Sequence, residues 1–127
     1  MRTPEDIESY LIRMDAGYEL LGQNIWVTKD TGADLVVSIS GPMVIFRVKV
    51  LDQARVPKAT REEFYRKLLE LNATEMLHGA YGLEEGAVVV TAAHELENLD
   101  FNEFQATLDD IGMAVSKHYP ILSRLAA

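Results

Sequence analysis

The three histidines, His78, His94 and His118, are the first candidates for acid–base chemistry or metal binding. The best metal candidate is His94, because Glu95 and Glu97 follow it closely. Neighbouring residues of a strand point to opposite faces, however, so His94 and Glu95 cannot bind one ion together unless the strand bends. No pair of histidines has the spacing of an HExxH motif. We therefore expect no metal and no cofactor.

Nucleophiles and paired carboxylates offer no clearer site. The chain has no cysteine, which excludes thiol nucleophiles and thiolate metal sites. No serine lies in a GxSxG turn, and neither a GxxxxGK[ST] nor a GxGxxG loop occurs. Glu84 and Glu85 fall on an expected hairpin tip, and Asp109 and Asp110 fall on an expected helix, where carboxylates are solvated. The sequence predicts no catalytic residue and a protein that is not an enzyme.

Composition and charge favour a globular protein domain over a nucleic-acid binder. The 127 residues are 48% hydrophobic and 25% charged, which fits a single domain over residues 1–127. The net charge is −8, whereas nucleic-acid binders are normally basic. Residues 68–127 hold ten Asp or Glu and only two Lys or Arg, which describes a solvated acidic surface or a face for a basic partner. No stretch has the length of a membrane span or the form of a signal peptide, so we expect a cytoplasmic protein without membrane partners.

The elements that would carry these residues form an α+β pattern. Thr3 and Pro4 begin a helix over residues 4–16, and Thr60 with Glu63 forms a capping box for a second helix to about residue 72. Asp100 begins a third helix, which Pro120 should end or kink. Strands are expected over residues 18–21, 25–29, 34–40, 43–51, 76–83 and 87–94, with a turn at 30–32.

Short turns between these strands imply antiparallel pairing. The order is α-βββ(β)-α-ββ-α, an antiparallel sheet with helices packed on one face. The alternation of the strand over residues 43–51 predicts one face toward the core and one half-polar face. The core face is expected to carry Val44, Phe46, Val48 and Val50, and the other face Met43, Ile45, Arg47 and Lys49.

Trp26, the only tryptophan, is the first candidate for a partner surface. It alternates with Ile25 and Val27, so if those two face the core, Trp26 lies on the other sheet face, where Met43 and Ile45 could join it. The alternative is that a helix of the same domain covers the indole. In the second helix, a stripe of Phe64, Leu68 and Leu71 is widened by Tyr65 and Leu69. Such an apolar margin favours self-association.

A family resemblance rests on the second half of the chain. Residues 78–90 read HGAYGLEEGAVVV, residues 96–100 read LENLD, and Phe104 and Leu108 follow. This glycine-containing strand, acidic hairpin tip, apolar strand and short acidic link into the last helix resemble the type III secretion chaperone-like superfamily. The chain has the element order of the class I chaperone fold and looks most similar to its YbjN-like branch.

The resemblance implies a cytoplasmic homodimer that binds a protein client, without enzymatic activity or cofactor. Carried over by element, it puts Trp26, Met43 and Ile45 near a client surface. It puts a second set near a dimer contact, namely Phe64, Tyr65, Leu68 and Leu69. Two other hypotheses stay open. One is a ligand-sensing or scaffold domain of roadblock-like or profilin-like type, and the other is an enzyme whose site assembles only in three dimensions.

Overall fold

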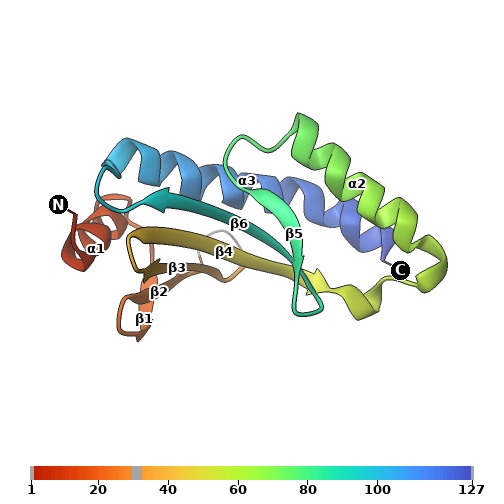
Figure 1. The fold of residues 1–127 in the computed structure, drawn as a ribbon, viewed down its shortest axis with the longest axis horizontal. Coiled ribbons are helices and arrows are strands. Elements are labelled where there is room, and N and C mark those ends of the chain that lie inside the picture. Colours follow the sequence, from red (N-terminus) through yellow and green to blue (C-terminus); the bar gives the residue numbers. More distant parts are fainter. Residues whose placement is uncertain (1, 30–32, 127) are drawn as a thin grey trace.

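A computed structural model describes residues 2–29 and 33–126, and the turn expected at 30–32 lies outside them. The elements follow the order α, four strands, α, two strands, α (Figure 1). The helices are α1 (Pro4–Arg13), α2 (Arg61–Thr74) and α3 (Phe101–Leu125). The strands are β1 (Tyr18–Gly22), β2 (Ile25–Thr28), β3 (Leu35–Ser40), β4 (Met43–Asp52), β5 (Ala80–Glu84) and β6 (Ala87–Glu95). Two short 3₁₀ helices, Gln53–Arg55 and Lys58–Thr60, link β4 to α2.

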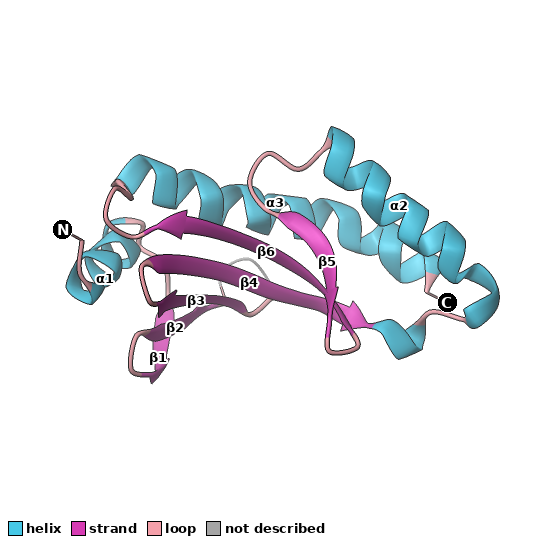
Figure 2. Cartoon of the chain, viewed as in Figure 1, coloured by secondary structure: helices cyan, strands magenta, loops and turns pink. Residues whose placement is uncertain are grey.

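The six strands form one antiparallel sheet in the order β1-β2-β3-β4-β6-β5 (Figure 2). All three helices contribute to the core on one face of this sheet. At its centre Phe104 of α3 lies between two other rings, with centroids 5.4 Å from both Phe46 and Tyr10. The expected α+β class, antiparallel sheet and element order are confirmed.

Helix α1 is held at both ends by side-chain contacts, of which the sequence predicts the one at its start. The Thr3 hydroxyl accepts from the Asp6 backbone N–H, and the Asp6 carboxylate accepts from the Thr3 N–H, which forms a capping box. The Tyr10 hydroxyl donates to the carbonyl of Leu99 across 2.9 Å. The Arg13 guanidinium lies 3.8 Å from the centroid of the Phe101 ring. These contacts dock α1 on the start of α3.

Strand β4 keeps the expected alternation up to a bulge. Val44, Phe46 and Val48 are buried against the helices. The pairing with β6 then shifts between Lys49 and Leu51, which marks a bulge in the strand. Beyond Val48, Leu51 is buried, and Val50 is half-buried and packs against the core, so Val50 stays with the expected core face.

The expected cap at Thr60 is wrong, and Pro120 does not end its helix. The Thr60 side chain makes no capping bond to α2, because Thr60 ends a 3₁₀ turn and its hydroxyl donates to the carbonyl of Pro57. Pro120 lies inside α3, which continues to Leu125. Leu122 beyond the proline is fully buried, and this burial offsets the cost of a proline in a helix.

Candidate functional site

A groove of about 500 Å³ lies between α1 and the β1–β2 hairpin. Ile12 of α1 and Leu20 of β1 stand on its two sides, and their side chains are 62% and 61% exposed. Glu5 and Glu8 line the same groove from α1. Leu21, the next residue of the hairpin, is also exposed. Large apolar side chains gathered beside carboxylates on a surface are typical of a binding site for another protein.

The floor of the groove is Trp26, which is only 2% exposed. Its indole Nε1 donates to Oε2 of Glu8 across 3.3 Å. Tyr18 also bonds to Glu8, and burial together with the Glu8 carboxylate raises the pKa of the Tyr18 phenol. Glu8 thus accepts from two rings of the sheet. A carboxylate fixed in this way can receive a cationic group that enters the groove.

The burial of Trp26 corrects one expectation from the sequence. Trp26 pairs with Val37, which pairs with Phe46, and this row faces the helices. Trp26 therefore does not share a face with Met43 and Ile45, and the alternative that a helix of the same domain covers it is the one observed. The premise failed because Ile25 is not a core residue and is exposed near the tip of the hairpin.

Met43 and Ile45 lie on the face of the sheet that points away from Phe46 and the core. Ile45 pairs with Ser38, and Ser38 pairs with Ile25, so these three residues form one row across three strands. Both Met43 and Ile45 are half-buried. This face is opposite to the one that carries Trp26, so Met43 and Ile45 do not line the groove.

Strand β1 is an edge of the sheet and pairs only with β2. Its register shifts between Leu20 and Gly22, and bulges are common at edges. An edge strand presents a row of backbone N–H and C=O groups that another extended chain can pair with. The groove therefore adjoins an edge strand of the sheet.

Helix α2 divides the residues expected at a dimer contact into two sets. Phe64 and Leu68 are buried in the core of their own chain, so they are not accessible to a partner. Leu69 is 68% exposed, and Tyr65 is half-buried with its hydroxyl bonded to Gln53. Tyr65 and Leu69 border a shallow apolar hollow of about 490 Å³ on the outer side of α2.

All three histidines bind α3 to the rest of the molecule. His78 bonds to Asp110, His94 bonds to Thr107, and His118 bonds to Tyr81 and Glu75. Within residues 2–29 and 33–126, no group of three metal-ligating side chains could hold an ion. In the same residues, no helix is long and apolar enough to cross a membrane.

The groove residues Ile12 and Leu20 were not found from the sequence. Ile12 lies beside the stripe of Ile7, Leu11 and Met14. An apolar residue outside the core-facing stripe of a helix indicates an exposed apolar side chain. The pair Leu20-Leu21 was a second signal, because adjacent strand residues face opposite sides and only one can enter the core.

Comparison with solved structures identifies the same fold at low sequence identity. A chain of the ExoU–SpcU complex from the type III secretion system of Pseudomonas aeruginosa matches with a TM-score of 0.71 at 16% identity, covering 90% of this chain and 95% of that one. YbjN from E. coli matches with a TM-score of 0.64 at 10% identity, covering 93% and 94%. A chain of the Yersinia pestis complex of the chaperone SycH with a fragment of YscM2 matches with a TM-score of 0.62 at 12% identity, covering 90% and 98%.

No curated protein matches this chain. A family model does match it, and the match extends over residues 1–127. The model is CesT_Tir_1, which describes type III secretion chaperones. The chain therefore belongs to the CesT_Tir_1 family of type III secretion chaperones.

Proposed function

We propose that this protein is a non-enzymatic, chaperone-like module that binds an extended segment of a client protein in the groove between α1 and the β1–β2 hairpin. The observation that carries this proposal is the exposure of Ile12 and Leu20 on either side of a groove that adjoins a sheet edge. Structural neighbours include the HopA1–SchA chaperone–effector complex and the complex of SycH with a YscM2 fragment. Family membership and these neighbours support a protein client.

The chemistry of the groove selects the kind of segment that fits. A strand added to β1 would gain backbone hydrogen bonds and would place alternate side chains toward Ile12 and Leu20. Glu5 and Glu8 favour Lys or Arg in the segment. The expected client segment is therefore extended, with alternating apolar and basic residues.

A labelled peptide tests the groove directly. The probe is a synthetic peptide of about twelve residues, alternating Ile and Lys, which is longer than a typical strand. Its binding is measured by fluorescence anisotropy. We expect wild-type protein to bind it and Leu20→Glu to bind at least about tenfold more weakly, because a carboxylate replaces an apolar contact. Ile12→Glu should behave like Leu20→Glu.

Leu77→Glu is the matched control, because Leu77 is an exposed leucine outside the groove lining. It adds the same charge to the same residue type, so it corrects for attraction between the basic peptide and an acidic protein. Equal affinity of Leu20→Glu and Leu77→Glu for the peptide would overturn the groove as the binding site. A scrambled peptide of the same composition separates strand addition from simple charge attraction.

We also propose that two copies associate through the outer side of α2. The supporting observation is the apolar hollow bordered by Tyr65 and Leu69, of which Leu69 is largely exposed. Sedimentation equilibrium should give a dimer mass for the wild type and a shift toward monomer for Leu69→Glu. A monomer mass for the wild type at tens of micromolar, about the range of weak dimers, would contradict this second proposal and leave the groove untouched.

A further inference from the structure

The outer edge of β5 is covered by a side chain of α2. Oδ1 of Asn72 accepts from the backbone N–H of Tyr81 at 2.7 Å, and Nδ2 of Asn72 donates to the carbonyl of Tyr81 at 3.2 Å. Since both groups of Tyr81 bond to α2, both point away from β6. The Asn72 amide thus makes the pair of bonds that a neighbouring strand would make there.

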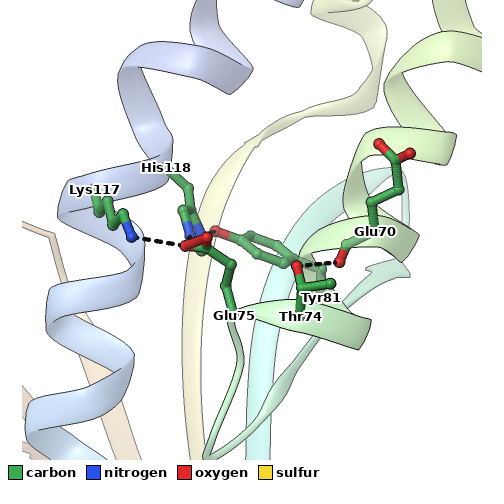
Figure 3. A network of polar contacts seen from close by, with 6 residues as sticks. All are labelled: Glu70, Thr74, Glu75, Tyr81, Lys117 and His118. Carbon is green, nitrogen blue, oxygen red and sulfur yellow. Dashed lines mark hydrogen bonds and ion pairs between the residues drawn. The ribbon is translucent and has the colours of Figure 1, made fainter.

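A second set of bonds holds Tyr81 and α2 in this arrangement (Figure 3). The Tyr81 hydroxyl lies 2.8 Å from Nδ1 of His118, and Nε2 of His118 lies 3.2 Å from Oε1 of Glu75. Nζ of Lys117 bonds to the same Glu75 oxygen at 2.8 Å. Glu75 follows α2 directly. Tyr81 is therefore bonded to α2 through its backbone, and to the end of α2 through its hydroxyl and His118 of α3. These bonds keep Asn72 over the edge of β5.

The two edges of the sheet differ in this respect. β1 and β5 are both terminal strands, and a molecule with two open edges can add copies at each end into an open chain. Within β5, only Tyr81 and Leu83 direct their backbone N–H and C=O groups away from β6, because alternate residues of a strand share one orientation. Asn72 bonds to the first of these two residues, Tyr81.

We propose that Asn72 closes the β5 edge against strand addition by a second copy of this chain, so that β1 is left as the edge that accepts a strand. The closure of β5 concerns self-association and does not depend on the client groove or on the contact at Tyr65 and Leu69, and only the role left to β1 rests on the proposed function. It assigns Asn72 a role in the specificity of assembly. Removal of its side chain should open β5 without removing a residue from the apolar core.

The test compares Asn72→Ala with Asn102→Ala, an exposed asparagine on α3. Hydrogen exchange at the Tyr81 amide should become at least about tenfold faster in Asn72→Ala and stay unchanged in Asn102→Ala, as expected for loss of one net hydrogen bond. Sedimentation velocity should show species larger than those of the wild type, increasing with concentration, only for Asn72→Ala.

Leu83→Pro in the Asn72→Ala background separates edge pairing from aggregation of a destabilised protein. The N–H of Leu83 points away from β6, so a proline there removes an edge donor without a ladder bond. It should abolish the larger species. Larger species that persist in this double variant would overturn the proposal, and so would unchanged assembly of Asn72→Ala with fast exchange at Tyr81.

If Asn72→Ala does not fold, Asn72→Asp replaces it. This variant keeps the shape, but its carboxylate places an oxygen against the Tyr81 carbonyl, and the repulsion between these two oxygens should displace the side chain from the Tyr81 backbone. We expect a folded protein, faster exchange at Tyr81 and the same concentration-dependent species. A folded Asn72→Asp protein with wild-type assembly at every concentration would contradict the proposed role.

Discussion

Trp26 and Glu8 are joined by a hydrogen bond of 3.3 Å from the indole Nε1 to Oε2, and this bond connects the second strand to the first helix. Trp26 is both the floor of the groove and a member of the core. The groove therefore depends on a side chain that no partner needs to touch. Glu8 in turn is held by hydrogen bonds from Trp26 and Tyr18.

Replacement of Trp26 should reveal its place in the core. We expect Trp26→Ala to lower the free energy of unfolding by about 3–5 kcal/mol, since a large buried ring leaves a cavity. Trp26→Phe should cost less, because it keeps a ring and loses only the donor to Glu8. Urea denaturation followed by circular dichroism measures both variants. A near wild-type free energy of unfolding for Trp26→Ala would show that the indole is not part of the core.

The sequence predicted the relative orientation of Trp26 correctly, but not the face of the sheet on which it lies. Alternation puts Trp26 opposite Ile25 and Val27, and it does so in the structure. Which set is covered depends on α1, and no local pattern in β2 reports that contact. Val27 is buried on the outer face while Ile25 is exposed, so burial in this short strand does not follow a simple period of two.

Gly79 is a position where the backbone requires glycine. Its φ is +87°, and an added Cβ would lie 2.9 Å from the carbonyl oxygen of Thr91 in β6. We expect Gly79→Ala to lower the free energy of unfolding by about 1–3 kcal/mol, from strain and the close contact. Gly82→Ala is the control in the same segment, because nothing lies within 4 Å of a Cβ there. Equal thermal stability of the two variants would contradict the close approach.

The threonines that precede α1 and α2 allow a second matched comparison of variants. The Thr3 hydroxyl accepts a backbone N–H of α1, whereas the Thr60 hydroxyl donates to Pro57 and caps nothing. We expect Thr3→Ala to cost about 1 kcal/mol, the usual value of a lost cap, and Thr60→Ala to cost clearly less. Chemical denaturation of both variants decides this. A larger loss for Thr60→Ala would mean that the capping box expected from the sequence forms in solution.

These starts also show which parts of the fold a sequence pattern can predict. Thr3, Asp6 and Pro4 form a local signal that needs no distant partner, and the helix begins there as expected. Thr60 carries the same local signal, but it is the last residue of a 3₁₀ turn, and its backbone angles there are φ −115° and ψ 6°. The asparagine at position 72 gave no signal at all, because its partner Tyr81 lies on another element.

Glu75 supplies a pH-dependent part of the stability. Hydrogen bonds from Lys117, and then from His118, hold the pKa of its carboxyl below the ordinary value of 4.5. Because the folded pKa is the lower one, the native state binds a proton less readily than the unfolded chain does. The stabilisation is therefore complete above about pH 4.5, the unfolded value, and it is lost as the pH falls through the folded pKa.

Glu75→Gln isolates this contribution, because glutamine has nearly the same shape without the charge. At pH 7 the variant should be less stable than the wild type, since the ion pair with Lys117 is gone. Below pH 4.5 the difference should shrink as the wild-type carboxyl becomes protonated. Thermal unfolding from pH 7 down to pH 3 measures this difference in stability. Glu70→Gln is the control, because Glu70 is an exposed glutamate of α2. A constant gap between Glu75→Gln and wild type across this range would mean that the carboxylate charge does not stabilise the junction of α2, β5 and α3.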